Sequence, residues 1–213
     1  MGPLRIRATQ LESFRLYLTE DWMEEASLLA SLTGEFTPTP AVRLGHAYHA
    51  VLEHPEQYRA SRGYVCEGYQ FDDATMAPML DLIDRRGVFE VKATKAFGPV
   101  TLVAQADQLV GAHLYEFKTT SHTFDPDKYL QSVQWRVMAA VFEPQAITYR
   151  VAQLDDHGNG VAELKALDSV TAYPYPNLER DLRDLVDRFV AYVQQRHLEP
   201  YLRQSHRAED LAA

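Results

Sequence analysis

The chain has 213 residues, of which 46% are hydrophobic and 24% charged, and its formal net charge is −9. These values predict a folded domain with one sizeable core, and no stretch approaches the ~20 uninterrupted apolar residues of a membrane-spanning helix. The single cysteine, Cys66, excludes an internal disulfide and a cysteine-ligated zinc or iron–sulfur site. The negative charge counts against nucleic-acid binding, unless a basic rim surrounds a local acidic site.

Hydrophobic periodicity and turn residues predict the secondary structure in chain order. The predicted helices cover residues 9–32, with a break near 19–21, and then 41–54, 72–85, 126–142 and 178–197. The predicted strands cover residues 88–94, 100–109, 112–119, 147–154 and 161–167. This order predicts one α/β (α+β) domain, with a central mixed β-sheet flanked by helices. The apolar spacing of the last helix favours packing on the protein's own core.

Two short apolar runs meet at Gly111 and predict a β-hairpin. The first run contains Asp107. The second contains Glu116 and Lys118, which point to the same face because they lie two residues apart on a strand. Pairing of the strands would bring Asp107 close to Glu116. An unpaired charge inside an apolar run is unfavourable, so we favour a ligand role for Asp107. Two carboxylates beside an ammonium are suited to hold a hard divalent cation, which phosphoryl chemistry uses.

Four segments of the chain form an ordered set. Residues 45–53 (GHAYHAVLE) come first, followed by Asp107, then residues 116–119 (EFKT), and then residues 131–135 (QSVQW). Together they resemble the PD-(D/E)XK nuclease superfamily, in its branch of RecB-like, Cas4-like and phage exonucleases. Tryptophan stands where the family's last element has tyrosine. The resemblance implies a restriction-endonuclease-like catalytic core at about 41–142, an N-terminal helical part at 1–40, and additional strands with a C-terminal helix at 143–213.

The resemblance also implies a metal centre. Asp107 and Glu116 would hold Mg2+ or Mn2+, with the backbone carbonyl of Phe117 as a third oxygen ligand. His49 would complete the coordination, which suits Mn2+ because imidazole is a softer ligand than a carboxylate. Lys118 would orient the attacking water or offset the charge that builds on phosphorus.

Other residues are implied in supporting roles. Glu53, one helical turn after His49, would accept a hydrogen bond from water in the site or act through a second ion. Gln131 would hydrogen-bond near the cation or the DNA backbone. His122, Lys128 and Arg136 follow the catalytic strand and are candidates for phosphate contacts.

These residues also have simpler interpretations, which the sequence leaves open. His49 is flanked by apolar residues and fits a half-buried helix histidine, and Gln131 fits a solvent-facing helix position. Lys118 fits a structural ion pair with Glu116 or Asp107. A second Glu-x-Lys sequence occurs at residues 90–92, but no strand aspartate precedes it. We therefore assign that strand as the outer partner of the hairpin and treat its glutamate as secondary.

The predicted function is that of a metal-dependent deoxyribonuclease that binds DNA. An exonuclease is favoured over a sequence-specific endonuclease, because 213 residues leave little room for a specificity domain. The expected setting is recombination, repair or phage DNA processing, beside a recombination or annealing protein as partner. The alternatives are a catalytically inactive nucleic-acid-binding or scaffold protein, and an enzyme that acts on RNA or another phosphate-containing substrate. The N-terminal residues lack the apolar run of a secretory signal, so we expect a cytoplasmic protein with no membrane partner.

Overall fold

The computed structural model describes residues 3–35 and 37–202. Its strands are β1 (Leu4–Arg7), β2 (Tyr64–Cys66), β3 (Tyr69–Phe71), β4 (Val88–Phe97), β5 (Val100–Val110), β6 (His113–Thr120), β7 (Ala146–Asp156) and β8 (Ala162–Ala172). Its helices are α1 (Ala8–Thr19), α2 (Glu25–Thr33), α3 (Pro40–Glu53), α4 (Pro55–Tyr58), α5 (Asp73–Leu80), α6 (Pro126–Gln131), α7 (Gln134–Phe142) and α8 (Leu178–Gln195). None of these helices is long and apolar enough to cross a membrane.

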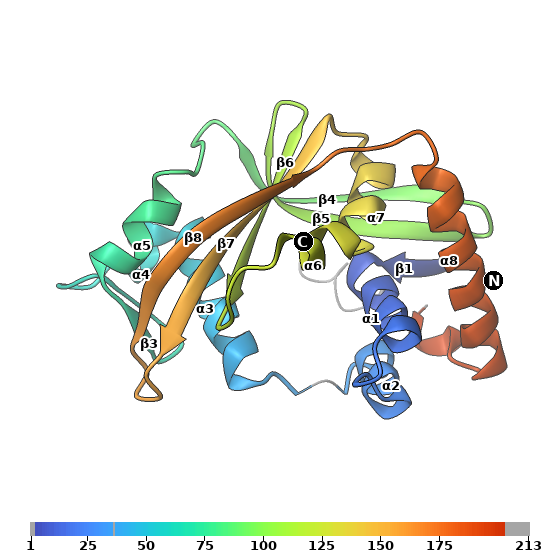
Figure 1. Ribbon diagram of the computed structural model, residues 1–213, viewed down its shortest axis with the longest axis horizontal. Coiled ribbons are helices and arrows are strands. Elements are labelled where there is room, and N and C mark those ends of the chain that lie inside the picture. Colours follow the sequence, from blue (N-terminus) through green and yellow to red (C-terminus); the bar gives the residue numbers. More distant parts are fainter. Residues whose placement is uncertain (1–2, 36, 203–213) are drawn as a thin grey trace.

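The main sheet has the strand order β1-β5-β6-β7-β8, and β4 pairs with β5 as well. The β1–β5 and β6–β7 pairs are parallel and the other pairs are antiparallel, so the sheet is mixed. Strand β5 pairs with β4 along almost its whole length but with β6 only at residues 108–110. Figure 1 shows the result, in which β4 and β5 turn away from β6, β7 and β8.

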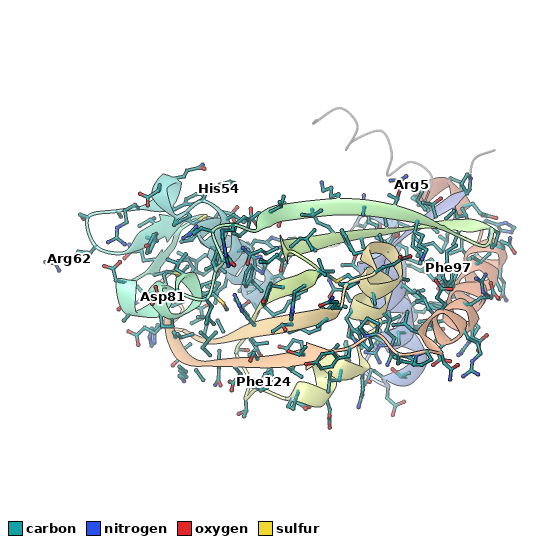
Figure 2. All side chains as sticks on the ribbon, turned by 90° about the horizontal axis from the view of Figure 1, so that it is seen from above. Arg5, His54, Arg62, Asp81, Phe97 and Phe124 are labelled. Atoms are coloured by element: carbon teal, nitrogen blue, oxygen red, sulfur yellow. The ribbon has the colours of Figure 1, made fainter. Side chains whose placement is uncertain are left out.

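Buried side chains form a large and a small apolar cluster, and alternate residues of β7 contribute to each, so the two clusters lie on opposite faces of the sheet at this strand. In the large cluster, Phe14 of α1 packs edge-on against Phe189 of α8, with ring centroids 5.2 Å apart. In the small cluster, Tyr48 of α3 packs edge-on against Phe71 of β3. Figure 2 shows both ends of the molecule, with Arg62 and Asp81 at one end and Arg5 and Phe97 at the other. The prediction that the last helix packs on the protein's own core is confirmed.

The predicted fold class is confirmed, and most predicted elements are present, but two helices differ. The helix predicted at 72–85 ends at Leu80, and the chain continues in turns and bends up to Gly87. The helix predicted at 126–142 is two helices, because Ser132 has an extended backbone (φ −57°, ψ 141°). The strands β1, β2 and β3 were not predicted, since three or four residues are too short for a clear alternation. The division into three parts stays a prediction.

Candidate active site

The site lies where β5 and β6 separate. The backbone ladder between these strands ends at the pair Gln108↔Tyr115, and the next two residues are bridged by their side chains. The backbone N–H of Phe117 donates to Asp107 Oδ2 at 2.7 Å, and the backbone N–H of Asp107 donates to Glu116 Oε1 at 3.2 Å. The two carboxylates therefore bridge the strands at the fork, which is the point where the backbone ladder ends. Both also line the cavity that lies there.

Lys118 lies close to both carboxylates. Its position on the same face as Glu116 agrees with the alternation of side chains along β6. Its Nζ lies 2.9 Å from Glu116 Oε2 and 3.8 Å from Asp107 Oδ2. Glu116 is 1% exposed, and burial together with the charge of Asp107 raises its pKa to about 7, against the opposing effect of Lys118. Burial acts to lower the pKa of Lys118, but the carboxylates of Glu116 and Asp107 outweigh it and raise that pKa. The lysine therefore carries its charge at neutral pH.

Helix α3 brings His49 to the same place. Its Nε2 donates a hydrogen bond to the backbone carbonyl of Phe117 and lies 4.0 Å from Asp107 Oδ2. Burial lowers the pKa of this histidine, and the nearby Asp107 only partly offsets that effect. A neutral imidazole is the form that coordinates a metal. The predicted grouping of His49 with the carboxylates and the Phe117 carbonyl is thus present in space.

A second pair of acids lies beside the first. Glu53, at the end of α3, shares a hydrogen bond with Glu90 of β4. The register of β4 and β5 on either side (Phe89↔Gln108 and Val91↔Ala106) places Glu90 opposite Asp107. Burial first, then Glu53, then Asp107 and Glu116, raise the pKa of Glu90 to about 8. Its backbone has φ +52°, a strained value for a glutamate.

The assignment of Glu90 as a secondary residue on an outer strand is therefore only half right. The strand is the outer partner of β5, but its glutamate belongs to the acid cluster, and Lys92 lines the same cavity. The alternation within residues 88–94 puts both side chains on one face, and this signal was available in the sequence. Their position opposite Asp107 was not available, because it depends on the register of the pairing.

The active-site cavity has a volume of about 580 Å³ and two ends of different charge. The acidic end contains Glu53, Asp107 and Glu116. The other end is formed by Arg7 at the end of β1, the first residues of α1 and Lys92. The position of Arg7 beside this site could not be read from the sequence, because the strand that positions it is four residues long.

Four predicted residues do not reach the cavity. Gln131 is exposed at the end of α6, whereas Gln134, at the start of α7, lines the cavity. His122 and Lys128 are exposed beyond β6 and do not line it. Arg136 points elsewhere and stacks on the ring of Trp135, 5.3 Å from its centroid. The helix break at Ser132 explains the placement of the two glutamines, because it changes the helical phase after residue 131.

The donor set fits Mg2+ or Mn2+. Carboxylate and carbonyl oxygens with one imidazole nitrogen are suitable ligands for these cations. The four acids Glu53, Glu90, Asp107 and Glu116 lie near one lysine, Lys118, and burial, followed by the neighbouring carboxylates, raises the pKa of Glu90 and Glu116. Within residues 3–35 and 37–202, no three His, Cys, Asp or Glu side chains form a ready-made metal cage. A cation at this place would compete with Lys118 for Glu116 and with the Phe117 carbonyl for His49.

Comparisons with known proteins define the fold. No family model matches the chain, and no curated protein matches it in sequence. Among solved structures, SSO0001 is 13% identical, with a TM-score of 0.54 over 90% of this chain and 78% of that chain. An alkaline exonuclease (LHK-Exo) from Laribacter hongkongensis is 15% identical, with a TM-score of 0.52 over 98% of this chain and 95% of that chain. Its structure in complex with dAMP gives a TM-score of 0.50, at 15% identity and coverages of 98% and 94%.

The chain therefore has the fold of an alkaline exonuclease. At identities of 13 to 15%, the likeness concerns the fold alone.

Proposed function

We propose that this protein is a divalent-metal-dependent nuclease that hydrolyses DNA phosphodiester bonds, and that it acts as an exonuclease. The observation that carries the proposal is the contact of Asp107, Glu116 and Lys118 at the fork between β5 and β6, with His49 facing them from α3. This set lies at one end of a cavity whose other end is basic, which suits a polyanion that carries one reacting phosphate.

The chain's residues divide the chemistry among them. Asp107, Glu116 and the Phe117 carbonyl, with His49, would hold Mg2+ or Mn2+, which supplies a Lewis acid for the scissile phosphate when bound. Lys118 stays protonated, so it donates hydrogen bonds to the attacking water or to the phosphoryl oxygens and stabilises the developing negative charge. Arg7 and Lys92 contact phosphates that lie further along the strand. Gln134 takes the hydrogen-bonding role expected for Gln131.

The proposal of exonuclease action rests on the comparison with solved structures. LHK-Exo is an exonuclease by name, and almost the whole of this chain superposes on it. Recombination, repair or phage DNA processing remains the proposed setting, with a recombination or annealing protein as partner. The cytoplasm remains the proposed location.

The test compares the wild type with Lys118→Met and Asp107→Asn. Each protein is incubated with end-labelled linear duplex, single-stranded DNA, RNA and covalently closed circular DNA, in Mn2+, Mg2+ or EDTA. The proposal requires loss of linear DNA that depends on metal and falls at least ~100-fold in both variants. Survival of the closed circle identifies an exonuclease. Cleavage of RNA alone, or no cleavage of any substrate by folded protein, contradicts the proposal.

A further inference from the structure

Two further hollows continue from the active-site cavity along helix α3. The first, of about 310 Å³, shares His46, His49 and Lys118 with the active-site cavity. The second, of about 360 Å³, shares Ala41 and Thr119 with the first. Helix α3 packs against β6 here, and Figure 1 shows it beside the ends of the β6 and β7 strands. The hollows therefore follow one another along α3, from the carboxylates to the end of β6.

The far hollow, which we call the hydroxyl pocket, differs in chemistry from the active-site cavity. Its walls carry four hydroxyl side chains and four apolar side chains, with one acid at its edge. The lining residues are Thr39, Pro40, Ala41, Leu44, Thr119, Thr120, Ser121, Leu154 and Asp156. No lysine or arginine is among them, so this pocket is poorly suited to a phosphate. Its volume lies within the range of small-molecule sites.

Two of the hydroxyls are available to a ligand. The Thr39 hydroxyl caps α3 by accepting from the N–H of Val42, and the Thr120 hydroxyl accepts from the N–H of His122. The hydroxyls of Thr119 and Ser121 bond to no other residue in the described part of the chain. A hydroxyl both donates and accepts, so it can pair with the edge of any nucleobase.

We propose that the hydroxyl pocket binds the base of a nucleotide next to the scissile phosphate. This inference rests on the proposed function, and it assigns a part of the DNA substrate, one base, to the pocket beside α3. A flat face of the base contacts the exposed side chains of Pro40 and Ala41, and its polar edge bonds to Thr119 and Ser121. The phosphates of the strand remain in the active-site cavity, whose Arg7 and Lys92 balance their charge. Because hydroxyls accept every base edge, the pocket recognises a base without selecting its sequence.

The variant Ala41→Phe tests the inference. Ala41 is exposed in the first turn of α3 and lines both hollows, so a phenyl group blocks the hydroxyl pocket with little effect on the core. The matched control is Ala77→Phe, at another exposed helical alanine, which lines none of the three cavities.

The substrates are oligonucleotides with one cleavable phosphodiester among phosphorothioate linkages. One abasic residue is placed at each position in turn on both sides of that linkage. For the wild type and Ala77→Phe, we expect the single-turnover rate at subsaturating enzyme to fall about tenfold when one particular neighbouring base is missing. For Ala41→Phe, we expect a rate on the intact oligonucleotide that is reduced by about the same factor and no further fall at that position. A blocked pocket and a missing base then have the same effect.

The inference is overturned if the wild type responds equally to an abasic residue at every position. It is also overturned if Ala41→Phe keeps the wild-type sensitivity. The affinity of the same oligonucleotides, measured by fluorescence anisotropy in EDTA, separates this failure from failure of the proposed function. A protein that cleaves nothing but loses affinity at one abasic position has the base pocket without the activity. A protein that neither binds nor cleaves these oligonucleotides contradicts both proposals.

Discussion

Asp107 and Glu116 exchange side-chain hydrogen bonds with each other's strands. The Asp107 carboxylate accepts from the backbone N–H of Phe117, and the Glu116 carboxylate accepts from the backbone N–H of Asp107. The same two groups are the proposed metal ligands. Their negative charge and their hydrogen bonds therefore serve different purposes, and substitutions can separate the two.

Asp107→Asn and Asp107→Ala should differ in stability but not in activity. Both remove a carboxylate ligand, and we expect both to lose at least ~100-fold in DNA cleavage. Asparagine keeps an oxygen that accepts from the Phe117 N–H, whereas alanine leaves this buried donor unpaired, which costs ~1–3 kcal/mol. Thermal and urea unfolding measure the difference. Equal stability of the two variants would show that the hydrogen bond from the Phe117 N–H to Asp107 does not contribute to the free energy of unfolding.

Glu90→Gln should stabilise the protein at alkaline pH. The pKa of Glu90 is raised from its ordinary value of 4.5 to about 8, so its ionised form is less favourable in the folded than in the unfolded chain. The resulting loss in the free energy of unfolding is absent below about pH 4.5, grows as the pH rises to 8, and stays constant above that. We expect Glu90→Gln to gain ~1 kcal/mol at pH 8.5, after allowance for partial exposure, and almost nothing at pH 4.5.

Melting temperatures in EDTA at both pH values measure this effect. Glu56→Gln is the control, because Glu56 is exposed on α4. An equal gain in melting temperature at both pH values, or a loss at pH 8.5, would contradict the raised pKa of Glu90.

Gln134→Ala should reduce cleavage, and Gln131→Ala should not. Gln134 lines the active-site cavity, whereas Gln131 is exposed at the end of the preceding helix. Loss of one hydrogen bond to the substrate predicts a fall in kcat/KM of about tenfold for Gln134→Ala. The two variants are matched in chemistry and lie three residues apart. A larger effect at Gln131 would restore the assignment made from the sequence.

Glu12→Ala should destabilise the protein. Glu12 of α1 accepts from the N–H of Val133 at 2.6 Å and from the hydroxyl of Ser132 at 2.8 Å, so it fixes the break between α6 and α7. Val133 is 1% exposed, and its N–H has no water to replace the lost partner. We expect a loss of ~2 kcal/mol in the free energy of unfolding. The exposed Glu56→Ala serves as the control, and a change of similar size there would show a nonspecific effect.

The sequence predicts the centre of the site better than its surroundings. The alternation on β6 and the turn at Gly111 were sufficient to bring Asp107, Glu116 and Lys118 together, because these contacts are local. Gln134 was missed because the helix break depends on Glu12, more than a hundred residues away. The place of Arg7 in the cavity could not be predicted, because it depends on the parallel pairing of β1 with β5.

The fold shows the same division between local and distant causes. Long amphipathic or alternating segments such as β5 and α8 were predicted within a few residues. Strands β2 and β3 have three residues each and exist because they pair with each other. No pattern within such a short segment reveals its partner.

The central claim is that the fork at Asp107 binds a divalent cation together with a DNA phosphate. Calorimetric titration of Mn2+ tests it most directly, with the wild type and Asp107→Asn each saturated by a phosphorothioate oligonucleotide that resists cleavage. The structure predicts Mn2+ binding by the wild type and at least ~10-fold weaker binding by Asp107→Asn, whose fold is intact. Equal Mn2+ affinity of the two proteins would contradict a metal centre at this fork.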